Sequence, residues 1–225
     1  MKKTLIYIMA ALMLSSCEDF LDTNDPTKAN SSNFPQTKEQ AEMILAGVYN
    51  GLNRISAIPY SSFHCISLLA CDDMLGGGGI GDKDAQAMDM ICVDEENRYE
   101  PFWAASYIGV ARANNAIATL PNCTGYADDN EKNQMLGEAY FMRAYYYAGL
   151  ASQFENIPVF ITPEAGNIPQ WDPKDTWKQI LLDYKTAIEL MPAEKVGYRK
   201  DGHANRWVAE GMLARAFLFY TGFYE

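Results

Sequence analysis

The chain has 225 residues, of which 48% are hydrophobic and 12% aromatic, and this content is enough for one globular domain with a sizeable core. Its 18 basic and 29 acidic residues give a formal charge of −11 at pH 7. Because an acidic surface repels phosphate groups, this balance argues against nucleic acid as a partner and against membrane attachment through basic patches.

The first residues have the order of a secretory signal peptide. Two lysines precede an apolar stretch over residues 5–14, which at about 1.5 Å per residue crosses only about half of a ~30 Å hydrocarbon core. Ser15-Ser16-Cys17 follows and resembles the bacterial lipobox, in which the cysteine receives a diacylglycerol before cleavage. We expect residues 1–16 to be removed, Cys17 to carry the lipid and residues 17–36 to form a tether. An ordinary secretory peptide with an incidental cysteine is the alternative.

Removal of the two lysines leaves 16 basic residues against 29 acidic ones, a formal charge of −13. Outside the cytosol, the four remaining cysteines have the chance to form disulfides, with three pairings open to them. They match no zinc-binding spacing, and the histidines His64 and His203 lie far apart in the sequence. We therefore expect buried free thiols, with one disulfide as the less favoured alternative, at Cys65, Cys71, Cys92 and Cys123.

Helical patterns begin after the tether. Thr37 is placed to cap a first helix whose apolar positions recur at three- and four-residue spacing, and Pro59 marks its end. Four consecutive glycines from Gly76 predict a mobile loop, with irregular structure continuing to Glu100. The helical pattern returns at Trp103 and stops at Pro121.

Three further helices follow. A long one contains Met135 to Leu150, and Asp172-Pro173 supplies the cap and first position of the next, which stops at Pro192. The last begins near Asn205.

An internal repeat relates these helices. The segment Phe141–Tyr147 aligns with Leu213–Phe219 at a distance of 72 residues, and each segment follows a helix that begins near a tryptophan and ends in proline. The order Trp177-x-x-Ile180-Leu181-x-x-Tyr184 matches part of the tetratricopeptide pattern. The sequence therefore predicts a mainly α fold of tetratricopeptide-like helical hairpins in an α-α superhelix, with irregular loops. No polar-faced capping element follows Tyr220, so we expect a truncated array.

Catalytic and metal motifs receive little support. Gly76-x-Gly78-x-x-Gly81 satisfies a dinucleotide fingerprint formally, but it follows no predicted strand and opens no predicted helix. Neither a carboxylate pair nor a nucleophile–histidine frame stands out, so we expect no enzyme, no metal and no cofactor. Solvated carboxylates are favoured over a calcium site for Asp72, Asp73, Asp82 and Asp84. A set of aromatic residues recurs at helical spacing, which favours a place in the core over a sugar-stacking surface. These residues are Tyr140, Tyr145, Tyr146, Tyr147, Phe217, Phe219 and Tyr220.

Six stretches follow one another along the mature chain: Cys17-Glu18-Asp19-Phe20-Leu21-Asp22, the helix over 41–52, Leu69-Ala70-Cys71-Asp72-Asp73, Trp103 to Asn114-Asn115-Ala116-Ile117, Glu138-Ala139-x-Phe141-x-Arg143-Ala144, and Asn205-x-x-x-x-Glu210-Gly211-x-Leu213-Ala214-Arg215. In this order and spacing they resemble the SusD/RagB family of outer-membrane nutrient-binding lipoproteins. The resemblance implies a surface-exposed, lipid-anchored protein of the cell outer membrane, and the acidic pair Glu18-Asp19 fits that placement.

The resemblance also implies a partner and a cargo. Members cap a SusC-like TonB-dependent transporter and deliver an oligosaccharide or similar nutrient to it, without catalysis. Members are longer than this chain, so residues 37–225 are expected to be the N-terminal helical-repeat domain, truncated at its C-terminus.

Glycan binding requires flat aromatic faces beside amides, guanidinium groups and carboxylates. The segment Asn97-Arg98-Tyr99 fits best, because it lies outside the helical stripes just before the Trp103 helix, and Asp73 is the next candidate. An ordinary polar linker is the alternative for this segment. The alternative function is that of a helical-repeat scaffold that binds protein partners without sugar.

Overall fold

A computed structural model describes residues 34–57, 62–71, 73–91, 99–164, 166–193 and 202–225. The chain divides into two units, Met1–Phe34 and Pro35–Glu225, and the second contains every helix described here. The predicted signal peptide, Cys17 and most of the tether lie outside the described residues, as do Cys92, Asn97 and Arg98.

The described residues form helices and no strand, with one isolated bridge between Thr37 and Thr124. None of the described helices is long and apolar enough to span a membrane. The mainly α prediction is therefore confirmed. The elements are α2 (Lys38–Ala57), α3 (Phe63–Leu69), α4 (Lys83–Asp89), α5 (Glu100–Thr119), the 3-10 turn η2 (Leu120–Asn122), α6 (Asp129–Phe154), α7 (Pro173–Leu190) and α8 (Arg206–Tyr224).

Side-chain caps explain why the predicted starts of α7 and α8 are right. The Asp172 carboxylate accepts a hydrogen bond from the backbone N–H of Lys174 at 2.9 Å, and Pro173 occupies the first helical position, where no N–H is needed. The Asn205 side chain accepts from the backbone N–H of Val208 at 3.1 Å. Each cap satisfies one of the N–H groups that a helix start leaves without an intrahelical partner.

The prediction of irregular structure up to Glu100 is wrong, because α4 lies within that stretch. Three residues of α4 are buried, including Met88, which is only 1% exposed. The glycine loop folds back on this helix: the backbone N–H of Gly76 donates to Asp89 and that of Gly78 to Asp82, each at 3.0 Å. A seven-residue helix is too short for a 3.6-residue apolar period to be visible in the sequence.

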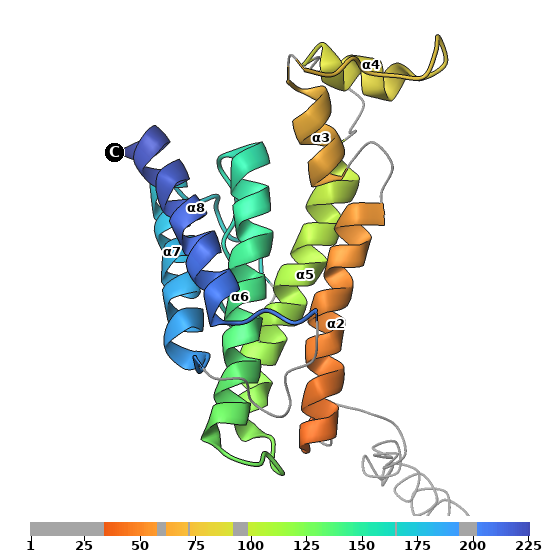
Figure 1. Ribbon diagram of the computed structural model, residues 1–225. Coiled ribbons are helices and arrows are strands. Elements are labelled where there is room, and N and C mark those ends of the chain that lie inside the picture. The colour runs from red at the N-terminus through yellow and green to blue at the C-terminus, as the bar shows by residue number, and fades with distance from the viewer. Residues whose placement is uncertain (1–33, 58–61, 72, 92–98, 165, 194–201) are drawn as a thin grey trace, which may run out of the picture. The chain divides into compact units, whose positions relative to one another are not determined.

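The longer helices pack in sequence order, α2 on α5, α5 on α6, α6 on α7 and α7 on α8 (Figure 1). This is the stacking of helical hairpins that the repeat predicts. The core contains aromatic residues of the predicted stripes, with Tyr146 and Tyr147 each 1% exposed and Tyr220 6% exposed. Phe217 departs from that prediction, because it is 53% exposed.

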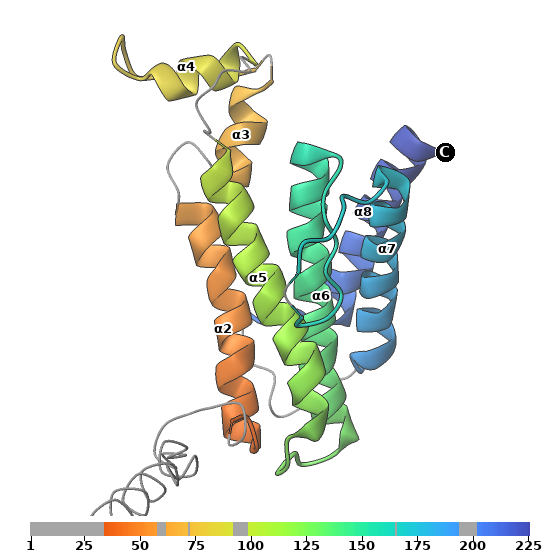
Figure 2. The ribbon, with the colours of Figure 1, turned by 180° about the vertical axis from the view of Figure 1, so that it is seen from behind.

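The segment that connects α6 to α7 crosses α5 and α6 (Figure 2). The Tyr147 hydroxyl donates to the carbonyl of Phe160 at 2.9 Å and accepts from its N–H at 2.6 Å. The amide of Asn114 donates to the carbonyls of Phe160 and Thr162, at 2.9 and 3.1 Å. Side chains from α5 and α6 thus satisfy backbone groups that an irregular segment would otherwise leave buried without partners.

Two buried carboxylates connect neighbouring elements. On α6, Glu138 has a fully buried side chain that accepts from the Tyr49 hydroxyl at 2.8 Å and from Gln134 at 2.7 Å, and His203 Nδ1 lies 2.8 Å from it. On α7, Asp183 accepts two hydrogen bonds from the Arg143 guanidinium, both at 2.7 Å. His203 therefore contributes to the structure as a partner of the buried Glu138 carboxylate.

Candidate functional site

The structure tests the predicted ligand residues only in part, since Asn97 and Arg98 lie outside the described residues. Tyr99 is the N-terminal cap of α5 and is half-buried against the core. Asp73 is exposed in the segment that follows α3. Both belong to the same end of the helical body, where α3 and α4 lie beyond the start of α5 (Figure 1).

Aromatic side chains follow each other along one face of α5 at this end. Tyr99, Trp103 and Tyr107 are spaced by four residues, which places them on one side of the helix, and all three are half-buried. The Tyr99 carbonyl accepts from the N–H of Trp103 at 3.1 Å, so Tyr99 continues the helical register. Phe154 at the end of α6 joins them, and we call these four residues the α5 aromatic face.

Edge and tilted contacts hold the α5 aromatic face in place. The Trp103 ring lies 4.8 Å from the Tyr107 ring and 4.9 Å from the Phe154 ring, which it meets at 89°. The Tyr107 hydroxyl donates to the carbonyl of Pro158 at 2.7 Å. Burial raises the pKa of Tyr107 well above its usual range, so the phenol remains a neutral donor at physiological pH. The result is a set of rings with fixed orientation and partial exposure.

The sequence predicts Tyr99 as a ligand residue, which stays a prediction, whereas Trp103 and Tyr107 stand out in the sequence only as part of a helical pattern. The missed signal is the unbroken i, i+4, i+8 series of aromatic residues at one helix end, whose members are large and amphipathic. Phe154 lies 51 residues after Trp103, and only the packing of α5 on α6 brings the two rings together.

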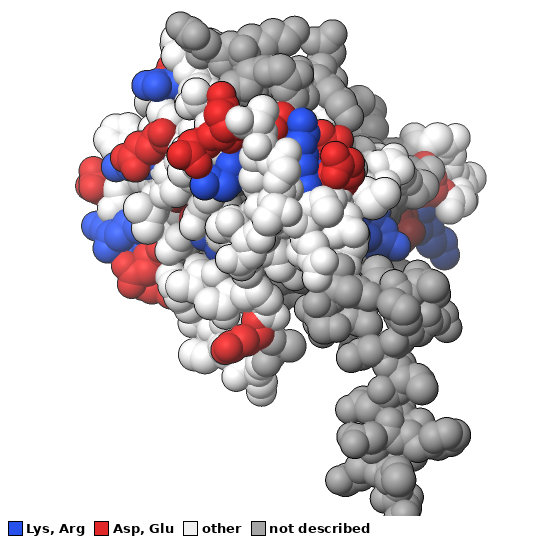
Figure 3. Space-filling model, turned by 90° about the horizontal axis from the view of Figure 1, so that it is seen from below, with Lys and Arg blue, Asp and Glu red and all other residues white. Residues whose placement is uncertain are grey.

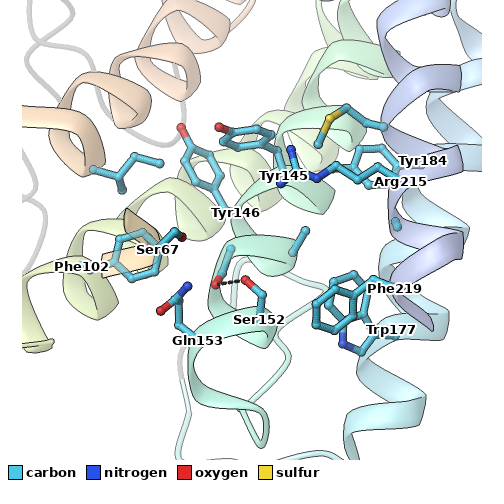
Figure 4. A pocket seen from close by; sticks show the side chains of 16 residues that line it. Ser67, Phe102, Tyr145, Tyr146, Ser152, Gln153, Trp177, Tyr184, Arg215 and Phe219 are labelled. Carbon is cyan, nitrogen blue, oxygen red and sulfur yellow. Dashed lines mark hydrogen bonds between the residues drawn. The ribbon is translucent and has the colours of Figure 1, made fainter. Parts of the chain in front are cut away.

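A hollow with a volume of about 310 Å³ is lined mostly by residues of α6 and α8, with others from α2, α3, α5 and α7 (Figure 4). One wall holds the stacked pair Trp177 and Phe219, whose rings are 4.4 Å apart. Three buried polar atoms in the lining residues have no hydrogen-bond partner among the described atoms: the Ser106 hydroxyl, Trp177 Nε1 and the Tyr184 hydroxyl. Burial raises the pKa of Tyr184, which keeps this phenol protonated.

Charges are interspersed on the described surface that is seen from below (Figure 3). Lys38 and Glu131 form an ion pair at 2.7 Å, which joins the N-terminal ends of α2 and α6. No basic patch gathers on this face, and a patch of that kind is what non-specific nucleic-acid binding requires.

The described residues contain no group of three or more side chains placed to hold a metal ion. Asp82, which precedes α4, and Asp89, its last residue, instead accept backbone hydrogen bonds from the glycine loop. Cys65, Cys71 and Cys123 are free thiols; Cys123 is buried as predicted, whereas Cys65 and Cys71 are only half-buried. Cys92 lies outside the described residues.

Helical hairpins that stack in sequence order define a tetratricopeptide-like helical repeat protein. Residues 19–218 match a SusD-like family described as "Starch-binding associating with outer membrane". The chain belongs to this SusD-like family.

Individual proteins that resemble this chain include curated SusD-like proteins and solved structures of SusD-like and surface glycan-binding proteins. SusD-like protein P2 of Formosa agariphila is 25% identical over 198 residues, which are 85% of this chain and 38% of that protein. The structure of surface glycan-binding protein A from Bacteroides fluxus aligns with a TM-score of 0.73 and 29% identity, over 84% of this chain and 41% of that one. A laminarin-binding SusD-like protein has the same fold, with a TM-score of 0.70 over 82% of this chain and 40% of that one. The chain thus spans about two fifths of the length of these relatives.

Proposed function

We propose that this chain belongs to a non-catalytic glycan-binding lipoprotein of the cell surface. Cys17 carries the lipid anchor, and the protein works with a SusC-like TonB-dependent transporter of the outer membrane. The α5 aromatic face is the observation that carries the binding proposal, because it presents several half-buried rings within the stretch that matches the family. The printed names of relatives that bind glycans or laminarin support it.

Binding on such a face is shallow and non-covalent. A sugar ring has an apolar side formed by its C–H groups, which packs on the exposed part of an aromatic ring, while the hydroxyls at its rim need hydrogen-bond partners. Asn97 and Arg98 directly precede Tyr99 in the chain, and Asp73 belongs to the same end of the helical body. These four residues are the proposed ligand-binding residues, together with Trp103.

Catalysis is not part of the proposal. Glycoside hydrolysis needs two carboxyl groups facing the scissile bond at a separation of about 5 to 9.5 Å. The acidic residues that adjoin the α5 aromatic face in the sequence are Glu100, the first residue of α5, and Glu155, the C-terminal cap of α6, and both are exposed to solvent. Binding and transfer, without bond cleavage, is the chemistry that this surface supports.

Calorimetric titration of the full chain with laminarin and starch oligosaccharides tests the proposal. We expect saturable binding that Tyr99→Ala and Trp103→Ala each weaken by roughly 3- to 10-fold, since one aromatic contact contributes about 0.5–1.5 kcal/mol. Phe217→Ala is the matched control, because Phe217 is an exposed aromatic residue on α8. Absence of saturable binding by a chain with a native circular dichroism spectrum contradicts the proposal, and so does release of shorter sugars during the titration.

A protein-binding scaffold is the second candidate function, and one observation favours it. Helix α8 exposes large apolar side chains, with Leu218 and Phe223 each 72% exposed. If the chain is a protein-binding scaffold, no oligosaccharide binds in the calorimetric titration, and the Tyr99→Ala and Trp103→Ala variants give the same result as the parent chain.

A further inference from the structure

Glu155, the C-terminal cap of α6, has a backbone conformation that is unfavourable for its residue type. Its φ is 60° and its ψ is −80°. Of the residues that the structure describes, only Ile91 and Glu155 combine a positive φ with a side chain. Glycine adopts such a conformation without strain and is the usual residue directly after a helix. Strained residues of this kind cluster at functional sites, so the retention of a glutamate here asks for a function.

The charge of Glu155 is unfavourable at this place as well. The carbonyl groups at the C-terminal end of a helix carry a partial negative charge, which favours a basic residue in the last turn. Helix α2 has Arg54 there, whereas the last turn of α6 contains no basic residue. Glu155 instead adds an exposed carboxylate to the end of α6. Both its backbone and its charge therefore make this helix end less stable than a glycine would.

The carboxylate of Glu155 borders the α5 aromatic face. The preceding residue is Phe154, whose ring lies 4.9 Å from the Trp103 ring. A second exposed carboxylate borders the face from α5, because Glu100 follows Tyr99 in the first turn of that helix. Two helices thus each place one carboxylate beside the half-buried rings.

Side-chain charge decides the potential at this face. The partial positive charge at the start of α5 and the partial negative charge at the end of α6 are of similar size and opposite sign. Among the described residues that directly adjoin the four ring residues in the sequence, Glu100 and Glu155 are the charged ones. Arg98 precedes Tyr99 outside the described residues, and residues 94–100 contain four acidic residues against this one arginine. The potential at the face is therefore negative.

The negative charge acts on groups at this end of the helical body. Burial raises the pKa of the Tyr224 phenol, and the negative charge of Glu155 raises that pKa further. Asp73, which is exposed at the same end, adds a charge of the same sign. An ionised carboxylate accepts hydrogen bonds and cannot donate them, so it matches the hydroxyl donors of a sugar and repels a second carboxylate.

We propose that Glu155, together with Glu100, makes the α5 aromatic face selective for neutral glycans over glycans that carry carboxylate or sulfate groups. Repulsion of the wrong ligand is an ordinary route to specificity. A neutral sugar keeps its stacking on the rings and offers donors to the carboxylates, whereas an acidic sugar brings a like charge. This inference rests on the proposed glycan binding and adds the chemical class of the ligand.

Calorimetric titration of the full chain with a matched pair of oligosaccharides tests this inference. The neutral member is a laminari-oligosaccharide, and the acidic member is the same oligosaccharide with its primary alcohols oxidised to carboxylates. In about 0.01 M salt, where charges act over ~30 Å, the acidic member should bind at least about fivefold more weakly. In about 1 M salt, where the screening length is ~3 Å, the two affinities should agree within about twofold.

Three variants separate the charge of Glu155 from its backbone strain. Glu155→Gln removes only the charge and should reduce the low-salt preference for the neutral member by about twofold or more. Glu155→Gly should reduce the preference equally and also raise Tm by about 1–4 °C, because it relieves the strain as well. The matched control is Glu189→Gln, at an exposed position near the C-terminal end of α7, which lies at the other end of the helical body (Figure 1). It should change the preference by less than about 1.5-fold.

The possible outcomes distinguish this inference from the proposed function. Equal or tighter binding of the acidic member in low salt overturns the selectivity and leaves glycan binding in place. A preference that Glu155→Gln does not change, or that Glu189→Gln changes as much, overturns the role of Glu155. Binding of neither member by a chain with a native circular dichroism spectrum contradicts glycan binding itself, and the selectivity with it.

Discussion

Replacement of Arg143 tests how much one buried ion pair contributes to the packing of α7 on α6. The guanidinium is 4% exposed and donates to Asp183 twice at 2.7 Å, to Asn114 at 2.9 Å and to the Ile161 carbonyl at 3.1 Å. In Arg143→Met the Asp183 carboxylate, whose side chain is 2% exposed, loses its cation but remains buried. An uncompensated buried charge costs about 3–5 kcal/mol.

A loss of this size is measurable by urea and thermal unfolding. For a domain of about 190 residues, 1 kcal/mol corresponds to about 2–4 °C in Tm, so Arg143→Met should lower Tm by about 6–20 °C. The double variant Arg143→Met/Asp183→Leu should cost no more than either single variant, because it leaves no unpaired charge. A single-variant loss below about 1 kcal/mol, or a double variant that equals the sum of both singles, refutes the reasoning. Arg215→Met is the control at the repeat-equivalent exposed position, with an expected change within about 0.5 kcal/mol.

Three further predictions concern packing, polar contacts and pH. Gly109→Ala should destabilise the chain by about 1–3 kcal/mol, because the added Cβ would lie 2.6 Å from ring atoms of Tyr146. Gly47→Ala has no atom within 4 Å of its Cβ and should stabilise α2 by up to about 1 kcal/mol. Urea unfolding compares the two variants, and equal effects on the free energy of unfolding contradict the packing argument. His203→Ala should lower the free energy of unfolding by about 1–3 kcal/mol in the same assay, because Glu138 loses one of its buried partners. His203→Gln should restore part of this stability. Equal stability of the two variants would assign the effect to packing. Burial raises the pKa of Tyr107, Tyr146, Tyr147 and Tyr184. The folded state holds these phenolic protons more tightly than the unfolded state, so the free energy of unfolding should be highest below the ordinary pKa of 10.0 and fall as the pH rises above it. Ultraviolet absorbance should show these phenols ionising only when the chain unfolds. Ionisation of all tyrosines before unfolding contradicts this prediction.

Helix starts and ends were predictable where the chemistry is local. Asp172-Pro173 and Asn205 predict the starts of α7 and α8, because a cap needs only a side-chain acceptor within three residues of the N–H that it binds. Helix α4 was not predictable in the same way. It depends on the burial of Met88 and on carboxylates that bind the glycine loop, and both are contacts between elements.

In the candidate site, too, local features could be predicted from the sequence, whereas contacts between helices could not. Tyr99 was predictable as an aromatic residue beside polar neighbours, and the four-residue spacing to Trp103 and Tyr107 was readable as well. The contribution of Phe154 was not, because the ring contact with Trp103 depends on the antiparallel packing of α5 on α6. Residue type also fails to separate core from surface: Phe217 and Tyr220 belong to one predicted stripe, yet they are 53% and 6% exposed.

The α5 aromatic face and the exposed apolar side chains of α8 belong to different helices, so substitutions in one are independent of the other to a good approximation. The α5 aromatic face is built on α5 and the end of α6, while α8 lies two helices later in the packing order. Substitutions without shared partners at separated sites are close to additive, typically within about 0.5 kcal/mol. Trp103→Ala should therefore weaken oligosaccharide binding, whereas Leu218→Glu should leave it unchanged within about twofold. If Leu218→Glu also abolishes oligosaccharide binding, the ligand is held jointly by α5 and α8, and the aromatic face alone is an incomplete site.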